Sequence, residues 1–79
     1  MGPVHKSLYT SRYKRLIKRL VAARSVAGLT QAQVAQKLGR AQSYVSKYES
    51  GERRLDVVEL IDIADVVAID VIELLNDLH

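Results

Sequence analysis

The chain has 79 residues, 48% of them hydrophobic and 27% charged, a composition that indicates one globular domain and is unlike that of a disordered protein. It contains no cysteine, which excludes disulfide bonds, thiol catalysis and cysteine-bound zinc. No apolar run approaches the roughly 18 residues of a membrane span, and no apolar signal core follows the basic residues near the N-terminus. We therefore expect a cytoplasmic protein.

Charge is divided sharply along the chain. All 12 Lys and Arg residues lie at or before Arg54, where Glu49 and Glu52 are the only acids, so this part has a surplus of ten positive charges. The other seven of the nine acids lie from Leu55 onward, where there is no Lys or Arg. This division predicts a basic and an acidic surface, and the basic one suits a polyanion. The alternative is that charges pair between the two halves.

Three helices are predicted before residue 52. Residues 1–10 have no helical period and are expected to form a flexible arm. Gly28 is expected to end the first helix as a left-handed cap, and Thr30 to begin the second, which Gly39 ends, through a capping box with Gln33. The third helix is expected at residues 41–50. The apolar positions that recur at helical spacing and are expected to face inward are Tyr13, Leu16, Ile17, Leu20, Val21, Val34, Ala35, Leu38, Val45 and Tyr48.

Two more helices are predicted in the acidic half. Asp56 and Asp70 are each followed by Glu three residues later, so each Asp is expected to cap a helix. No stretch alternates with period two beside turn signals, so no strand is expected and the fold class is all-α, a single domain at residues 11–79. The fourth helix is expected to bury Val57, Leu60, Ile61, Ala64 and Val67, and the fifth offers Val71, Leu74, Leu75 and Leu78.

The second and third predicted helices, joined at Gly39-Arg40-Ala41, have the pattern of a helix-turn-helix, whose second helix fits a DNA major groove. The order of the motifs GLTQ, VAQKLG, VSKYESG and ADVV resembles the XRE family of Cro- and lambda-repressor-like DNA-binding domains, over roughly residues 16–75. The resemblance implies a five-helix lambda-repressor-like bundle that binds double-stranded DNA. It also implies a role for each matching residue.

Gln42 and Ser43 match positions that read base edges in family members, and glutamine can bond adenine bidentately. Lys47 lies on the same face, and Ser46 is a secondary candidate. Arg24 and Glu49 match an ion pair that orients the reading helix. The residues expected to contact the DNA backbone are Gln31, Arg40, Tyr44, Arg53 and Arg54.

Several of these roles have alternatives. Tyr44 is alternatively expected to contact a thymine methyl group, or to shield the turn with its ring. Arg40 is alternatively expected to read a base. Arg53 and Arg54 are alternatively a solvated pair near the acidic fourth helix. Ala41 stands where the family often has Ser or Thr, so the reading helix is expected to lack a side-chain cap.

No metal, cofactor or catalytic site is expected. His5 and His79 lie at opposite ends of the chain, and the carboxylates after Leu55 are spread along helices without a glycine-bearing loop. The glycines at 28, 39 and 51 each end a helix, so they form no phosphate-binding loop. No nucleophile–base pair has a supporting spacing, and we expect no enzyme.

The last two helices hold more apolar residues than a small core needs, which is typical of an interface. We expect a homodimer that binds a palindromic operator as a small, stand-alone, nucleoid-associated regulator, since two-fold symmetry matches paired half-sites. One alternative is an antitoxin that holds a toxin protein, and another is an interaction module that does not read DNA. RNA polymerase is a further candidate partner. The expected dimer interface comprises Val66, Val71, Leu74, Leu75 and Leu78.

Overall fold

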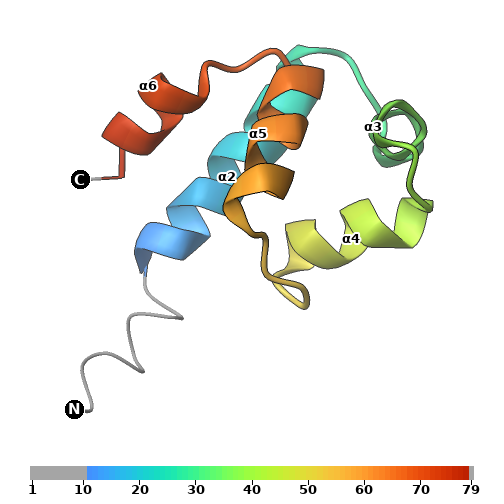
Figure 1. Cartoon of the computed structure of the whole chain (residues 1–79), viewed down its shortest axis with the longest axis horizontal. Coiled ribbons are helices and arrows are strands. Elements are labelled where there is room, and N and C mark those ends of the chain that lie inside the picture. The colour runs from blue at the N-terminus through green and yellow to red at the C-terminus, as the bar shows by residue number, and fades with distance from the viewer. Residues whose placement is uncertain (1–10, 79) are drawn as a thin grey trace.

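The computed structural model describes residues 11–78, and they form helices without any strand. The all-α prediction is confirmed. The predicted arm at residues 1–10 and His79 lie outside the described part. In Figure 1, α2 and α5 occupy the middle of the molecule, with α3 and α4 on one side and α6 on the other. The helices are α2 (Ser11–Val26), α3 (Gln31–Leu38), α4 (Gln42–Ser50), α5 (Val57–Val66) and α6 (Val71–Asn76).

Local sequence signals set the helix ends, as predicted. Gly28 ends α2 with φ of +72°, and the Leu29 N–H donates to the Arg24 carbonyl at 3.1 Å, which closes the last turn. Thr30 caps α3 by accepting from the Gln33 N–H at 3.1 Å, while the Gln33 side chain accepts from the Thr30 N–H at 2.8 Å. Asp56 and Asp70 cap α5 and α6 through their carboxylates.

The core receives side chains from each of the helices α2 to α6 of the described part, so each of these helices depends on the others for burial. The predicted inward faces of α2, α3 and α4 are confirmed, with Tyr13, Val21 and Leu38 partly buried at the edge of the core. The fully or nearly fully buried hydrophobic residues are Leu16, Ile17, Leu20, Val34, Ala35, Tyr44, Val45, Tyr48, Leu60, Ile63, Ala64, Val67 and Leu74.

The predicted inward face of α5 is partly wrong. Val57 and Ile61 are 71% and 47% exposed, whereas Ile63 is fully buried. Leu60, Ala64 and Val67 are buried as predicted. The helix has apolar residues on two adjacent faces, so spacing alone did not show which face meets α3 and α6, the neighbours that it contacts.

The place of α6 corrects one dimer prediction. Leu74 is 0% exposed because α6 turns it into the core between α2 and α5, so it does not lie on a surface that a second subunit reaches. The neighbouring Leu75 is 46% exposed. Arg19 pairs with Asp77, and an Arg15 Nη donates to the Leu78 carbonyl at 3.4 Å, so basic α2 is fastened to the acidic end of the chain.

Candidate nucleic-acid interface

The turn between α3 and α4 is tight because Gly39 adopts a left-handed conformation. Its φ is +70°, and the next N–H, that of Arg40, donates to the Ala35 carbonyl at 2.9 Å. No heavy atom lies within 4 Å of the place a Cβ would take at Gly39, so the backbone conformation rather than lack of space favours glycine. Ala41 begins α4 without a side-chain cap, as the sequence indicated.

The outer face of α4 is polar. Gln42, Ser43, Ser46 and Lys47 are all exposed, and their spacing of one, three and one residues places them on one side of the helix. Val45 and Tyr48 on the opposite side are 0% and 1% exposed. The outer face therefore offers an amide, two hydroxyls and an ammonium group, which are the groups that bond base edges and phosphates.

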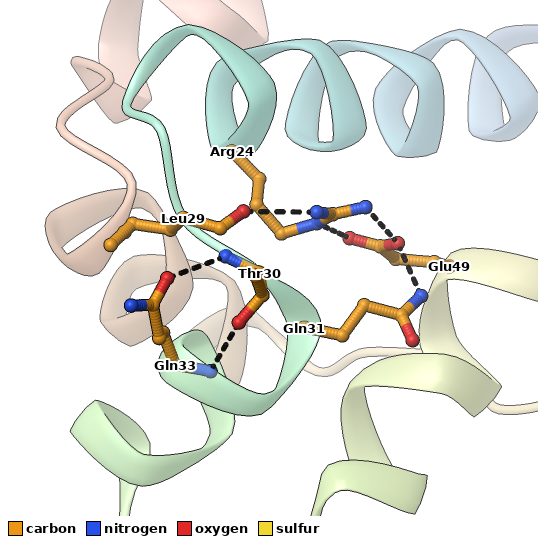
Figure 2. A network of polar contacts seen from close by, with 6 residues as sticks. All are labelled: Arg24, Leu29, Thr30, Gln31, Gln33 and Glu49. Carbon is orange, nitrogen blue, oxygen red and sulfur yellow. Dashed lines mark hydrogen bonds and ion pairs between the residues drawn. The ribbon is translucent and has the colours of Figure 1, made fainter.

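Three side chains that meet between α2, α3 and α4 form what we call the Glu49 cluster: Arg24, Gln31 and Glu49 (Figure 2). Arg24 donates from Nε and Nη2 to the two Glu49 oxygens at 2.7 and 3.0 Å, and from Nη1 to the Leu29 carbonyl at 3.0 Å. The Glu49 and Arg24 side chains are 8% and 19% exposed. The hydrogen bond to Glu49 raises the pKa of Arg24. The cluster ties α2 and the start of α3 to the end of α4.

Gln31 contributes to this cluster through its amide, whose Nε2 donates to Glu49 Oε1 at 2.8 Å. The sequence predicted only a phosphate contact for this residue. A primary amide has a second N–H and an acceptor oxygen, so the bond to Glu49 orients the side chain and leaves it the capacity to bind a phosphate. That phosphate contact stays a prediction.

A second group, the Glu59 cluster, comprises Arg40, Tyr44, Arg53 and Glu59. Arg53 donates from Nη1 and Nη2 to the two Glu59 oxygens at 3.0 and 2.8 Å, and Arg40 Nη2 lies 3.6 Å from Glu59 Oε2. The Glu59 side chain is 13% exposed. The hydrogen bond from Arg53, with help from the Asp56 N–H, lowers the pKa of Glu59 to about 2.

Sequence reasoning missed the cluster because it gave Glu59 only a place in the first turn of a helix. Glu59 does close the α5 capping box, accepting from the Asp56 N–H at 3.0 Å. Its second role depends on the loop after α4, which brings Arg53 back to α5. The single signal in the sequence was that Glu59 is an acid close to the adjacent cations Arg53 and Arg54.

Tyr44 packs into the core, which leaves little of it exposed for the DNA-backbone contact that the resemblance implied. Its side chain is only 9% exposed and meets Tyr48 edge to face, with ring centroids 5.6 Å apart. The guanidinium groups of Arg40 and Arg53 lie 4.3 and 4.8 Å from the ring centroid. Burial, followed by the charge of Glu59, raises the pKa of its hydroxyl. The ring therefore shields the turn, which was the alternative to a backbone contact.

The alternative explanation of the charge division, that charges pair between the basic and the acidic half of the chain, is partly correct. Glu59 and Asp77 from the acidic half pair with Arg40, Arg53 and Arg19 from the basic half. Arg54 packs elsewhere, with its guanidinium 4.2 Å from the centroid of the Tyr13 ring. Arg40, Lys47 and Arg54 are nevertheless exposed, so cations remain on the surface around α4.

Within residues 11–78, no three His, Asp or Glu side chains come together in a way that could hold a metal ion. None of the helices described there is both long enough and apolar enough to cross a bilayer.

Together, the fold and the polar face of α4 define a helix-turn-helix DNA-binding regulator. A family model described as a helix-turn-helix domain matches residues 15–76. The chain is also similar to the solved structure of an XRE-family like protein from Pseudomonas syringae pv. tomato str. DC3000, with a TM-score of 0.87 and 45% sequence identity over 95% of this chain and 92% of that one. No curated protein matches it. The chain belongs to the XRE family of helix-turn-helix proteins.

Proposed function

We propose that the protein is a homodimeric transcription regulator that binds a palindromic operator and places α4 in the major groove. The observation that carries the proposal is the outer face of α4. Its polar residues from Gln42 to Lys47 are exposed on one side, and the Glu49 and Glu59 clusters hold the helix from behind and from its ends. A reading helix needs both properties, since base contacts demand a fixed position.

In this proposal the four residues on the outer face of α4 have different tasks. Gln42 and Ser43, in the first turn, reach base edges, and Gln42 has the amide geometry for adenine. Lys47 lies about a turn further on and contacts guanine or a phosphate, with Ser46 beside it. The residues proposed to contact the DNA backbone are Gln31, Arg40, Arg53 and Arg54.

We assign the dimer interface to the outer face of α6. Ile72 and Leu75 are 68% and 46% exposed, and Val71 and Leu78 lie beside Leu75 at helical spacing. Val66, the last residue of α5 that was expected in the interface, is half-buried and lies beside Lys37 and Leu38 of α3 rather than on α6. Exposed apolar groups gathered in this way are typical of a subunit contact. A two-fold dimer then presents two copies of α4 to half-sites about 34–36 Å apart.

A binding selection from random duplex DNA at physiological salt tests the function. We expect an enriched palindrome whose half-site spacing fits one turn of DNA. Gln42→Ala should cost about 1–3 kcal/mol at one base position, whereas Arg53→Ala should weaken binding to all sequences similarly. If Gln42→Ala leaves both preference and affinity unchanged, α4 is not the reading helix in the orientation proposed.

A matched pair of variants tests the interface. Leu75→Glu places a charge on α6 and Val58→Glu places one on α5, where Val58 is 67% exposed. We expect Leu75→Glu to give monomers in sedimentation equilibrium and Val58→Glu to leave the dimer intact. The reverse result would move the interface to α5.

The antitoxin and interaction-module hypotheses need a surface for another protein. Val57, Val58 and Ile61 form an exposed apolar group on α5 that is separate from the proposed dimer face. This exposed apolar group supports the hypothesis of a protein partner, either a toxin or RNA polymerase. A selection that enriches no sequence would favour those hypotheses over the operator-binding regulator.

A further inference from the structure

Glu59 lies where three segments around the reading helix meet. Arg40 comes from the turn before α4, Tyr44 from the first turn of α4, and Arg53 from the loop after it. Arg40 and Arg53 both approach the same carboxylate, that of Glu59 on α5. Their guanidinium groups also lie over the Tyr44 ring. One side chain on α5 thus connects the two chain segments that lead into and out of α4.

The carboxylate itself is fixed. It is 13% exposed and accepts from the Asp56 N–H at 3.0 Å as part of the α5 cap. Removing Arg53 from it would leave a mostly buried carboxylate with the Asp56 N–H and the more distant Arg40 as its partners, which is unfavourable. We therefore expect Arg53 to stay on Glu59 when DNA binds.

Arg53 can donate to a DNA phosphate from this position. Its backbone N–H donates to the Lys47 carbonyl at 3.2 Å, so the loop is held at the main chain as well. The guanidinium donates to both Glu59 oxygens and to the Arg54 carbonyl, and its side chain is still 39% exposed. A guanidinium has five N–H donors, so these bonds leave donors for a phosphate.

Arg40 is held more loosely. Its closest approach to Glu59 is 3.6 Å, to one oxygen, and its side chain is 48% exposed. Its guanidinium rests over the Tyr44 ring at 4.3 Å. A phosphate beside the start of α4 can draw it away at little cost.

We propose that Glu59 is a positioning residue for DNA binding, which holds Arg53 as a fixed phosphate donor and keeps Arg40 close to the start of α4. This inference rests on the proposed function. It makes a prediction opposite in sign to simple electrostatics. Glu59→Gln makes the protein more positive, which alone would strengthen binding to a polyanion. If Glu59 positions the arginines, the same substitution weakens binding.

The test measures dissociation constants for the duplex enriched in the selection, or for a mixed-sequence duplex at low salt, across a salt series. We expect Glu59→Gln to weaken binding roughly eightfold at 0.1 M salt and to reduce the salt slope by about one, the effect of losing one phosphate contact. The control is Glu52→Gln, which removes an exposed acid from the same loop and should bind equally well or more tightly. Tighter binding by Glu59→Gln would overturn the proposal.

A double-mutant cycle separates positioning from general damage. If Glu59 acts through Arg53, the double variant Glu59→Gln with Arg53→Ala binds no more weakly than Arg53→Ala alone. Additive losses would mean that Glu59 does not act through Arg53. The amide oxygen that Glu59→Gln introduces can still accept from the Asp56 N–H, and thermal melts verify that each variant is folded. Glu59→Asp, which keeps the charge but shortens the reach, provides a second variant.

A measurement on the free protein keeps this inference distinct from the proposed function. NMR relaxation of the Arg53 Nε–H should show a rigid side chain in the wild type and a mobile one in Glu59→Gln. A mobile Arg53 in the wild type would overturn the positioning role, whatever the DNA data show. If the wild type binds no duplex even at low salt, the proposed function is wrong, and Glu59 then positions nothing for DNA.

Discussion

The Glu49 and Glu59 clusters are built from the same chemistry but present it differently. In each, a carboxylate with at most 13% of its side chain exposed accepts two bonds from an arginine. Arg24 of the Glu49 cluster is only 19% exposed and directs its third bond to the Leu29 carbonyl. Arg53 and Arg40 of the Glu59 cluster are 39% and 48% exposed.

Because of this difference, we expect the Glu49 cluster to stabilise the fold and the Glu59 cluster to contribute to binding an anion. The Glu49 cluster uses its cation internally, so it stabilises the angle between α2 and α4. The Glu59 cluster fixes its cations beside the surface, where they remain able to meet another anion. Variants that weaken the first should lower stability most, and variants that weaken the second should change DNA binding most.

The largest effect on stability is expected from Arg24→Ala. It removes three hydrogen bonds and leaves Glu49 mostly buried with the Gln31 amide as its neighbour. We expect the free energy of unfolding to fall by about 2–3 kcal/mol in urea titrations, below the range for fully buried pairs because Arg24 is partly exposed. The control is Arg19→Ala, whose pair with Asp77 is 37% and 47% exposed and should cost under about 1 kcal/mol. If both substitutions lower the free energy of unfolding equally, the Glu49 cluster stabilises the fold no more than an exposed ion pair does.

The Glu59 cluster should appear in the pH dependence of stability. The pKa of Glu59 is lowered from 4.5 to about 2, so the unfolded chain takes up this proton first. Its contribution is fully present above about pH 5, declines as the pH falls below 4.5 and is lost near pH 2. Thermal melts of wild type and Glu59→Gln should therefore differ at pH 7 and converge towards pH 2. Asp62→Asn, an exposed change on the same helix, should follow the wild type throughout.

A new cap would add a third support to α4. Ala41 has the extended backbone of an N-cap, with φ of −69° and ψ of 152°, but no side-chain acceptor. Ala41→Ser should raise the free energy of unfolding by about 0.5–1 kcal/mol, measured in urea. If Ala41→Ser also sharpens base preference in the duplex selection, then the start of α4 is the end that the two clusters hold less firmly.

The smallest effect is expected far from both clusters. Ala68, between α5 and α6, has a φ of +61°, a conformation that side chains with a Cβ disfavour. Ala68→Gly should stabilise the fold by roughly 0.5 kcal/mol and shift the melting temperature upward by a few degrees. DNA affinity should not change, because the turn lies at neither end of α4. A change in affinity would show that α5 and α6 are coupled to the reading helix.

Much of the fold could be predicted from local residues. Thr30, Asp56, Asp70 and the helix-ending glycines act within a few residues of themselves, so the sequence determined where most helices begin and end. The polar outer face of α4 could be predicted equally well, because the polar residues from Gln42 to Lys47 follow the helical period. The Arg24–Glu49 contact came from family resemblance, since spacing alone cannot bring together two residues 25 apart.

Tertiary structure decided what depends on neighbours. Both faces of α5 are apolar, and only packing against α3 and α6 determined that Ile63 is buried while Ile61 is exposed. Packing also buried Leu74 in the core and left the neighbouring Leu75 exposed. Tyr44 became a shield because the loop after α4 returned Arg53 and met Glu59. The sequence thus determined the helices and the polar outer face of α4, whereas the folded chain determined which charges are paired, because pairing depends on distances that only packing sets.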